Sequence, residues 1–154
     1  MVEGSANAPL AAPYVNDLIL LRRRRLSPRW ARRGERNYSY DAVMRHVGAS
    51  QERLGLETFD LLSIHDAMGE PMEDVMASDG ALGALRKLQD EGIVKYVGSA
   101  MNDPDTNEPY IATGEFDVAV VPNAWSLLNR RGENRIFLAA EKHHVGLLMA
   151  QPFE

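Results

Sequence analysis

Apolar and polar positions follow two different spacings along most of this chain. Over residues 40–54, apolar side chains recur every three to four positions, which is typical of an amphipathic helix. Gly55 follows as a stop signal for that helix. The next run, residues 59–64, is short and mostly apolar, as a buried strand is, and it ends in the polar pair His65 and Asp66.

The same unit recurs towards the end of the chain. A helix predicted to begin at a Ser78 or Asp79 cap ends at Gly92, and a less regular helix is expected between residues 103 and 114. The remaining expected elements are a helix over 134–143 and strands over 94–98, 116–121 and 145–149. This alternation predicts an α/β fold with about four parallel strands, intervening helices and right-handed crossovers. Ligands bind at the carboxyl ends of such strands.

The first part of the chain lacks this periodicity. Residues 1–37 hold small residues, Pro and eight Arg, so we expect a poorly ordered Arg-rich head before one folded domain over 38–154. The whole chain has a net charge of -5, with +5 up to Arg36 and therefore -10 in the remainder. A basic head can bind phosphates, but the acidic body argues against nucleic acid as the main ligand.

Length and composition narrow the classes of protein. The 154 residues suffice for one globular domain but fall short of a complete (β/α)₈ barrel, which needs about 200 residues or more. The absence of Cys excludes a disulfide scaffold, a thiolate metal site and a Cys nucleophile. His143 and His144 are adjacent, and adjacent helix residues do not share a face, so we expect no metal site.

The lengths of the apolar runs indicate whether the chain has a membrane span or a signal peptide. The run at residues 18–21 is far shorter than the roughly 20 residues of a membrane span, and no charged segment of a signal peptide precedes it. We therefore expect neither an anchor nor a secretion signal, and a cytoplasmic location is the default expectation.

Several separated segments resemble, in order, the aldo/keto reductase family, particularly its aldose, fucose and galactose dehydrogenase branch. They are residues 38–41 (YSYD), 59–66 (FDLLSIHD), 97–102 (VGSAMN), 125–130 (WSLLNR) and 145–153 (VGLLMAQPF). The resemblance implies a (β/α)₈ TIM barrel, of which this chain would be a part. It also implies NADP or NAD bound across the face formed by the carboxyl ends of the strands.

The resemblance implies that His65 is the catalytic histidine of a hydride-transfer site in which Tyr, Lys and Asp also act. From the residues alone, the favoured role of His65 is a hydrogen bond at the rim of the sheet. The other three groups have no counterpart, because the first Lys of the chain is Lys87 and Tyr14 and Asp17 lie in aperiodic sequence. An untuned Tyr is a poor acid near neutral pH, since its ordinary pKa is about 10.

Further candidate contacts follow from the same resemblance. Ser99, Asn102 and Asn123 are the candidates for binding the cofactor, although Asn also forms turns. Asp66 and Trp125 are the candidates for binding the substrate, with a loop cap and a rim aromatic as the structural alternatives.

Two positions depart from the family pattern. Ala100 and Met101 stand where the family has a Ser-Asn pair, and Pro122 stands where it has a Gln. These departures weaken the predicted cofactor contacts.

The sequence predicts two main alternative functions. One is an NAD(P)-dependent oxidoreductase for an aldose or small carbonyl compound, present as a truncated and inactive chain. The other is a non-catalytic half-barrel that serves interaction or assembly. An open sheet leaves unpaired strand edges and an apolar face that a closed barrel would fill, so we expect self-association in either case.

Overall fold

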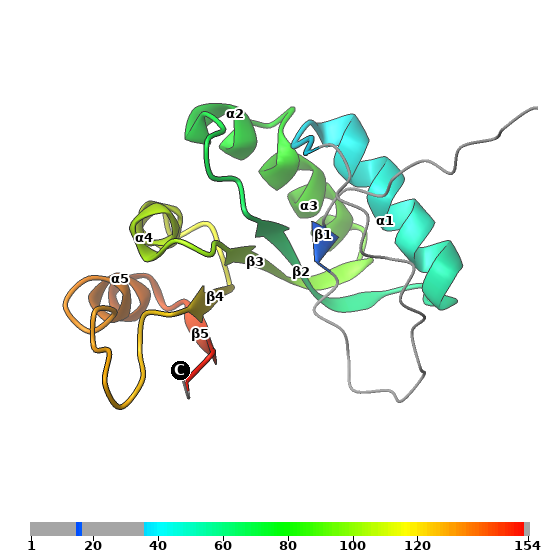
Figure 1. Ribbon diagram of the computed structural model, residues 1–154. Helices are drawn as coiled ribbons and strands as arrows, with labels where there is room; N and C mark the ends of the chain where they lie inside the picture. Colours follow the sequence, from blue (N-terminus) through cyan, green and yellow to red (C-terminus); the bar gives the residue numbers. More distant parts are fainter. Residues whose placement is uncertain (1–14, 17–35, 153–154) are drawn as a thin grey trace, which may run out of the picture.

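The computed structural model describes residues 15–16 and 36–152 as one sheet with helices packed against it (Figure 1). In chain order the elements are β1 (Val15–Asn16), α1 (Tyr40–Leu54), β2 (Phe59–His65), α2 (Met72–Met76), α3 (Ala81–Asp90), β3 (Val94–Ala100), α4 (Pro104–Ala112), β4 (Val118–Pro122), α5 (Ile136–His143) and β5 (Gly146–Ala150).

The sheet has the strand order β1-β2-β3-β4-β5. Strands β2 to β5 run parallel, as predicted, and each pairs with the next along the chain. This confirms a partial α/β barrel of four parallel strands with intervening helices. Strand β1 pairs antiparallel with β2 through Val15 and Asn16. The rest of the predicted head up to residue 35 lies outside the described residues.

Helix α1 begins and ends where the sequence indicates. The Ser39 hydroxyl accepts a hydrogen bond of 3.4 Å from the Ala42 amide at the first turn. Gly55 follows the last turn with a φ of 64°, a left-handed conformation that glycine adopts without a Cβ clash. Local signals were sufficient here because both ends of the helix are set by neighbouring residues.

Helix α3 begins later than predicted. Its N-cap is Gly80 rather than Ser78 or Asp79, and no side chain caps it. A Cβ at Gly80 would lie 2.1 Å from the Asp74 carbonyl oxygen, so only glycine fits there. The close approach comes from α2, a five-residue helix that the apolar spacing did not predict.

Two strands begin later than the apolar runs do. Phe116 is buried before β4 starts, and the Asp117 amide donates a 2.8 Å hydrogen bond to the Val97 carbonyl oxygen. The Val97 amide in turn donates to the Asp117 carboxylate at 2.8 Å. These residues therefore anchor the entry to the strand, while Val145 similarly precedes β5 as a buried residue.

The core lies between the sheet and its helices and forms two clusters. The larger includes Val47, Leu62, Leu85, Val97 and Tyr110, and the smaller comprises Ile111, Ala119, Val121, Ala124, Ile136, Ala140 and Val145. Figure 1 shows α1 and α3 beside the first part of the sheet and α4 and α5 beside the second. Helix α4 joins the clusters, since its consecutive residues Tyr110 and Ile111 belong to different ones.

The opposite face of the sheet is apolar and incompletely covered, as predicted. Partners across a parallel pair point to the same side, which puts Leu61 with Tyr96 and Val120 with Leu148. Tyr96 and Leu148 are each 42% exposed, whereas the helix-facing Val97 and Val121 are fully buried. In a closed barrel this face would line the packed interior.

Within residues 36–152, no helix has the length and the apolar composition that crossing a bilayer requires.

Candidate active site

His65 is the last residue of β2, and Asp66 directly follows it. The Nδ1 atom of His65 lies 3.4 Å from the Oδ2 atom of Asp66, and their side chains are 19% and 14% exposed. The strand thus places a partly buried imidazole beside a carboxylate at the carboxyl end of the sheet, which is the edge where parallel α/β folds bind ligands.

Asp66 is held by the end of the neighbouring strand. Its Oδ1 accepts a 3.0 Å hydrogen bond from the Asn102 backbone amide, and its Oδ2 accepts a 2.9 Å bond from the Asn102 side chain. Its own amide donates to the Ala100 carbonyl oxygen at 2.9 Å. These contacts hold Asp66 at a φ of 51°, a conformation that L-residues rarely adopt.

Tyr38 and Arg36 reach the same strand end from the segment before α1. The Tyr38 hydroxyl donates a 2.7 Å hydrogen bond to the His65 carbonyl oxygen, and the Arg36 guanidinium donates at 3.2 Å to the Asp66 carbonyl oxygen. Burial raises the pKa of Tyr38 to about 12. The Tyr38 phenol is therefore neutral near neutral pH. Tyr38 belongs to the family-like segment 38–41, but neither it nor Arg36 was a candidate site residue in the sequence, because neither lies at the end of a predicted strand.

The charge state of His65 follows from its surroundings. Burial lowers the pKa of the imidazole below its ordinary value, the Asp66 carboxylate opposes that change, and the Arg36 guanidinium adds to it. Because the net direction is downward from 6.5, the ring is predominantly neutral near neutral pH. A neutral imidazole has one nitrogen that donates a hydrogen bond and one that accepts.

The predicted site residues do not all gather at this rim. Asn102 joins His65 and Asp66 there. Ser99 lies on the helix side of β3, fully buried, and its hydroxyl donates a 3.0 Å hydrogen bond to the Asn107 side chain. The Ser99 hydroxyl is therefore directed away from the face that carries His65.

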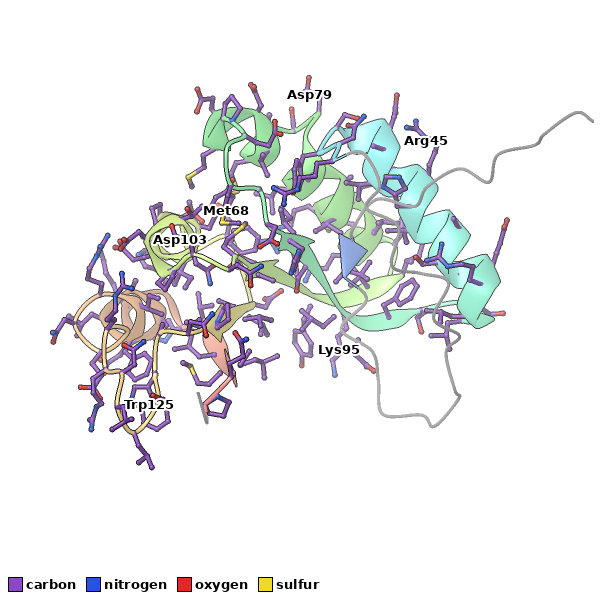
Figure 2. The ribbon with its side chains drawn as sticks, in the orientation of Figure 1. Arg45, Met68, Asp79, Lys95, Asp103 and Trp125 are labelled. Atoms are coloured by element: carbon purple, nitrogen blue, oxygen red, sulfur yellow. The ribbon has the colours of Figure 1, made fainter. Side chains whose placement is uncertain are left out.

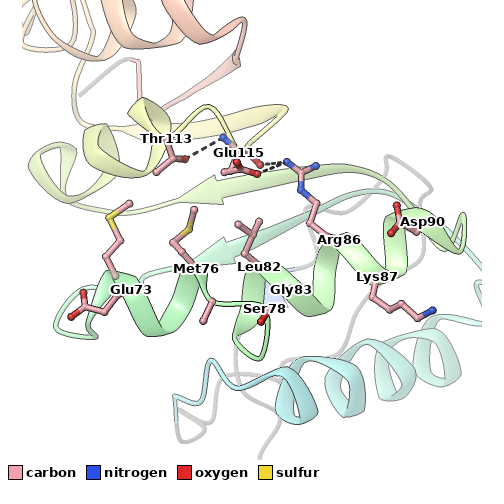
Figure 3. A pocket seen from close by; sticks show the side chains of 12 residues that line it. Glu73, Met76, Ser78, Leu82, Gly83, Arg86, Lys87, Asp90, Thr113 and Glu115 are labelled. Atoms are coloured by element: carbon pink, nitrogen blue, oxygen red, sulfur yellow. Dashed lines mark hydrogen bonds and ion pairs between the residues drawn. The ribbon is translucent and has the colours of Figure 1, made fainter.

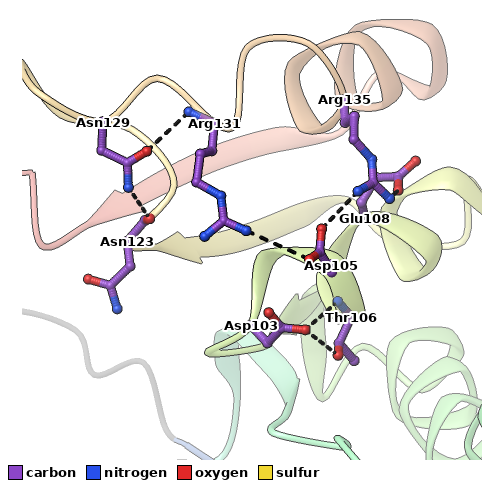
Figure 4. Close-up of polar contacts among 8 residues, drawn as sticks. All are labelled: Asp103, Asp105, Thr106, Glu108, Asn123, Asn129, Arg131 and Arg135. Carbon is purple, nitrogen blue, oxygen red and sulfur yellow. Dashed lines mark hydrogen bonds and ion pairs between the residues drawn. The ribbon is translucent and has the colours of Figure 1, made fainter.

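Asn123 follows β4 and begins a loop that hydrogen bonds within itself (Figure 4). Its carbonyl oxygen accepts a 2.7 Å bond from the Asn129 side chain, while its own side chain is exposed and points away from that contact. Ser126 tightens the loop by accepting from the Leu128 amide at 3.2 Å and the Asn129 amide at 3.0 Å.

Trp125 lies in the same loop, between β4 and α5 (Figure 2). Its indole N–H donates a 3.1 Å bond to Glu133, and its ring centroid lies 6.3 Å from that of Phe137 on α5. The ring therefore packs between the loop and the helix. Leu127 and Leu128 are each 93% exposed.

A nicotinamide carboxamide has both hydrogen-bond donors and an acceptor, so a site for it must offer accessible polar groups of both kinds. Ser99 is buried and the Asn102 side chain is hydrogen bonded to Asp66, so Asn123 remains as the candidate whose exposed amide points away from its own loop contact (Figure 4). These three residues alone do not form a nicotinamide-binding site. We therefore assign these residues no role in a hydride-transfer step.

A separate groove lies on the helix side of the sheet, with a volume of about 730 Å³ (Figure 3). Met72, Met76 and Leu82 line it, and Arg86 crosses to Glu115 at 3.3 Å. None of the predicted site residues contributes to this groove. It is therefore distinct from the His65 rim.

Among residues 36–152, no three His, Asp or Glu side chains come together in a way that could hold a metal ion. His143 is the last residue of α5, and His144 follows it as the C-cap with a left-handed φ of 57°.

The comparisons with known proteins agree with this fold. The sequence matches the model of the Aldo/keto reductase family over residues 19–154, which is most of the chain. The chain therefore belongs to the aldo/keto reductase family of oxidoreductases, a family that acts on small carbonyl compounds. The family model therefore matches from residue 19, whereas the segments that resemble the family in the sequence begin only at residue 38.

Individual relatives match over part of their own length. The chain is 28% identical over 121 residues to D-threo-aldose 1-dehydrogenase of a Pseudomonas species, covering 79% of this chain and 36% of that protein. It is 29% identical over 124 residues to pyridoxal 4-dehydrogenase of Microbacterium luteolum, covering 76% of this chain and 36% of that protein. The chain thus spans about a third of the length of these relatives.

Solved structures share the fold. An aldo-keto reductase from Bacillus halodurans has a TM-score of 0.58 and 24% identity, over 72% of this chain and 36% of that one. The glycerol dehydrogenase of Gluconobacter oxydans has a TM-score of 0.59 and 24% identity, over 75% and 33% of the two chains. These likenesses support the partial barrel assigned from the sheet.

Proposed function

We propose that this chain supplies the histidine-bearing part of an NAD(P)-dependent oxidoreductase acting on an aldose or another small carbonyl compound. The observation that carries this proposal is the position of His65. It is a partly buried, predominantly neutral imidazole at the carboxyl end of a parallel barrel strand, fixed by Asp66 and Tyr38. A group held in this way can orient the oxygen of a carbonyl or hydroxyl group beside a hydride donor.

The names of the relatives support the substrate class. The matched proteins include an aldose dehydrogenase, a pyridoxal dehydrogenase and an NADH-specific methylglyoxal reductase of Escherichia coli. All three names refer to an aldehyde or its hydrated or cyclic form. We propose an aldose or small aldehyde as the substrate, with NAD or NADP as the cofactor.

We propose further that the 154-residue chain is inactive alone. It has no Lys before Lys87, so no Tyr preceding His65 can be tuned by a Lys in the way the family resemblance requires. Among the candidate cofactor contacts, Ser99 is buried and the Asn102 side chain is hydrogen bonded to Asp66, which leaves the exposed side chain of Asn123. Losing a positioned acid typically costs 10²- to 10⁴-fold in rate, before the loss of cofactor binding is counted.

Two assays test these points. The purified chain should show no oxidation or reduction of nicotinamide cofactor with aldoses, pyridoxal or methylglyoxal. A chimaera with residues 38–152 in place of the matching segment of the Pseudomonas dehydrogenase should regain turnover and lose it on His65→Ala. Turnover by the chain alone that disappears in His65→Ala would refute the proposed inactivity. A folded chimaera unaffected by His65→Ala would refute the role of His65.

A second function is favoured by the uncovered sheet face. Tyr96 and Leu148 present apolar surface to solvent, and β5 ends the sheet without a further strand among the described residues. Residues 145–152 also carry no charged side chain in a chain whose body is acidic. Two copies could therefore approach at this edge without like-charge repulsion. We propose self-association there, as an assembly module, if catalysis has been lost.

A further inference from the structure

We propose that the loop between β4 and α5 inserts its two exposed leucines into the methionine-lined groove of a second copy of this chain. Leu127 and Leu128 are each 93% exposed, more than any other large apolar side chain among the described residues. They are adjacent, so they form one apolar projection at the tip of the loop. Contiguous apolar surface exposed in this way marks a site of interaction with another surface.

The loop holds this projection in a fixed shape. The Ser126 hydroxyl accepts hydrogen bonds from the amides of Leu128 and Asn129, at 3.2 and 3.0 Å. At the base of the loop, the Gly132 amide donates to the Ala124 carbonyl oxygen at 2.7 Å. Because these bonds already order the loop, little conformational entropy is lost when the leucines bind.

The groove between α2, α3 and the turn after α4 offers a matching apolar surface (Figure 3). Met72, Met76 and Leu82 line it, and its volume of about 730 Å³ is enough for two leucine side chains. Methionine side chains are unbranched and adapt to the shape of a partner. Leu127 and Leu128 are too exposed to fill the groove of their own chain, so the contact must join two copies.

The charges around the groove favour a basic partner. Its two cations, Arg86 and Lys87, are each paired with a glutamate of their own chain. Glu73 and Asp90 line the groove with exposed side chains, and neither forms an ion pair with another described residue. An incoming segment therefore meets carboxylates whose charge is not neutralised by a close cation.

The loop carries the opposite charge. Arg130 and Arg131 follow the leucines, and residues 123–132 contain no carboxylate. Arg130 pairs with Glu133 and Arg131 lies 3.7 Å from Asp105, yet both guanidinium side chains are 64% exposed. They remain accessible to a second copy. Complementary charges of this kind orient two surfaces and speed their encounter.

The loop and the groove are different surfaces, so the contact is heterologous and copies add head to tail. It is separate from the uncovered sheet face and does not depend on the proposed oxidoreductase function. Two leucines bury less area than a standard stable interface does, so we expect association only at concentrations well above micromolar.

Sedimentation of the Leu148→Lys protein isolates this contact from the sheet face. We expect its average mass to rise with concentration without a fixed limit. A loop variant, Leu127→Ser with Leu128→Ser, should associate at least about tenfold more weakly, because the burial of two leucines is lost. A groove variant, Met76→Lys, should also associate more weakly, because a charge enters the apolar groove. Leu138→Lys on α5 is the control and should leave association unchanged.

A mixture of the two variants tests the pairing of loop with groove. Each variant, in the Leu148→Lys background, keeps one of the two surfaces, so either alone should be monomeric. An equimolar mixture should form a heterodimer and nothing larger. If Met76→Lys does not fold, Glu73→Lys with Asp90→Lys replaces it, because both positions are exposed.

Three results would overturn the proposal. They are a Leu148→Lys protein that is monomeric at every concentration, a loop variant that associates as its parent does, and a mixture that remains two monomers. Binding to anionic phospholipid vesicles that requires Leu127 and Leu128 and occurs without self-association would also overturn it, because the loop would then contact a membrane surface.

Discussion

The hydroxyl of Tyr38 donates a 2.7 Å hydrogen bond to the carbonyl oxygen of His65 and so ties the segment before α1 to the end of β2. Tyr38→Phe removes this bond and leaves a partly buried carbonyl without it. We expect a loss of about 1 kcal/mol in the free energy of unfolding at neutral pH, measured by urea denaturation.

The burial of the Tyr38 phenol gives its contribution a defined pH dependence. The pKa of Tyr38 is raised from 10.0 to about 12, so the folded protein favours the protonated phenol. Its contribution is fully present below pH 10 and is lost as the pH rises through 12. The difference in stability between the wild type and Tyr38→Phe should therefore shrink over this interval. A difference that grows instead would contradict this assignment.

Two glycine substitutions should have opposite effects. Gly80→Ala forces a Cβ to within 2.1 Å of the Asp74 carbonyl oxygen, so we expect a loss of about 1–3 kcal/mol in thermal or urea unfolding. Gly48→Ala in α1 is the matched control, since a Cβ there meets nothing within 4 Å. It should stabilise the protein by about 0.5–1 kcal/mol, because alanine favours helix over glycine. Equal effects of both changes would rule out the backbone contact as the cause.

A salt-sensitive contact joins α4 to α5 (Figure 4). Arg135 lies 2.8 Å from Asp105 and also pairs with Glu108. Because Arg135 and Asp105 are 55% and 60% exposed, Arg135→Ala should destabilise the chain less than Gly80→Ala does, and high salt should diminish the effect. A double-mutant cycle with Glu108→Gln measures the coupling. Coupling that persists unchanged at 1 M salt would show that the pair is not screened.

The uncovered sheet face predicts how the chain associates. Leu148→Lys places a charge on that face and should shift sedimentation towards monomer at micromolar concentration. Leu138→Lys is the control, because Leu138 is 59% exposed on α5, away from this face. The proposed association surface would be wrong if both variants behaved alike or if the wild type were already a stable monomer.

Sequence patterns could predict those features of the fold that are determined by residues close together in the chain. Ser39 and Gly55 delimit α1, and the apolar run before His65 identifies β2. The contact between Asp66 and Asn102 depends on strand register and on the left-handed backbone at Asp66, neither of which is encoded locally. Helix α2 has only five residues, too few to show an apolar period. Tyr38 belongs to the family-like segment 38–41, but nothing local indicates that its hydroxyl reaches the carbonyl oxygen of His65.

The division of the core into two clusters that meet at α4 has a consequence for folding. Tyr110 belongs to the larger cluster and the next residue, Ile111, to the smaller. Most of the larger cluster lies in the part of the chain that leaves the ribosome first, so it can form before β5 has been synthesised. The smaller cluster then packs against the larger cluster, which has already folded. In native-state hydrogen exchange, amides of α5 and β5 should accordingly open at lower free energy than those of β2 and α3.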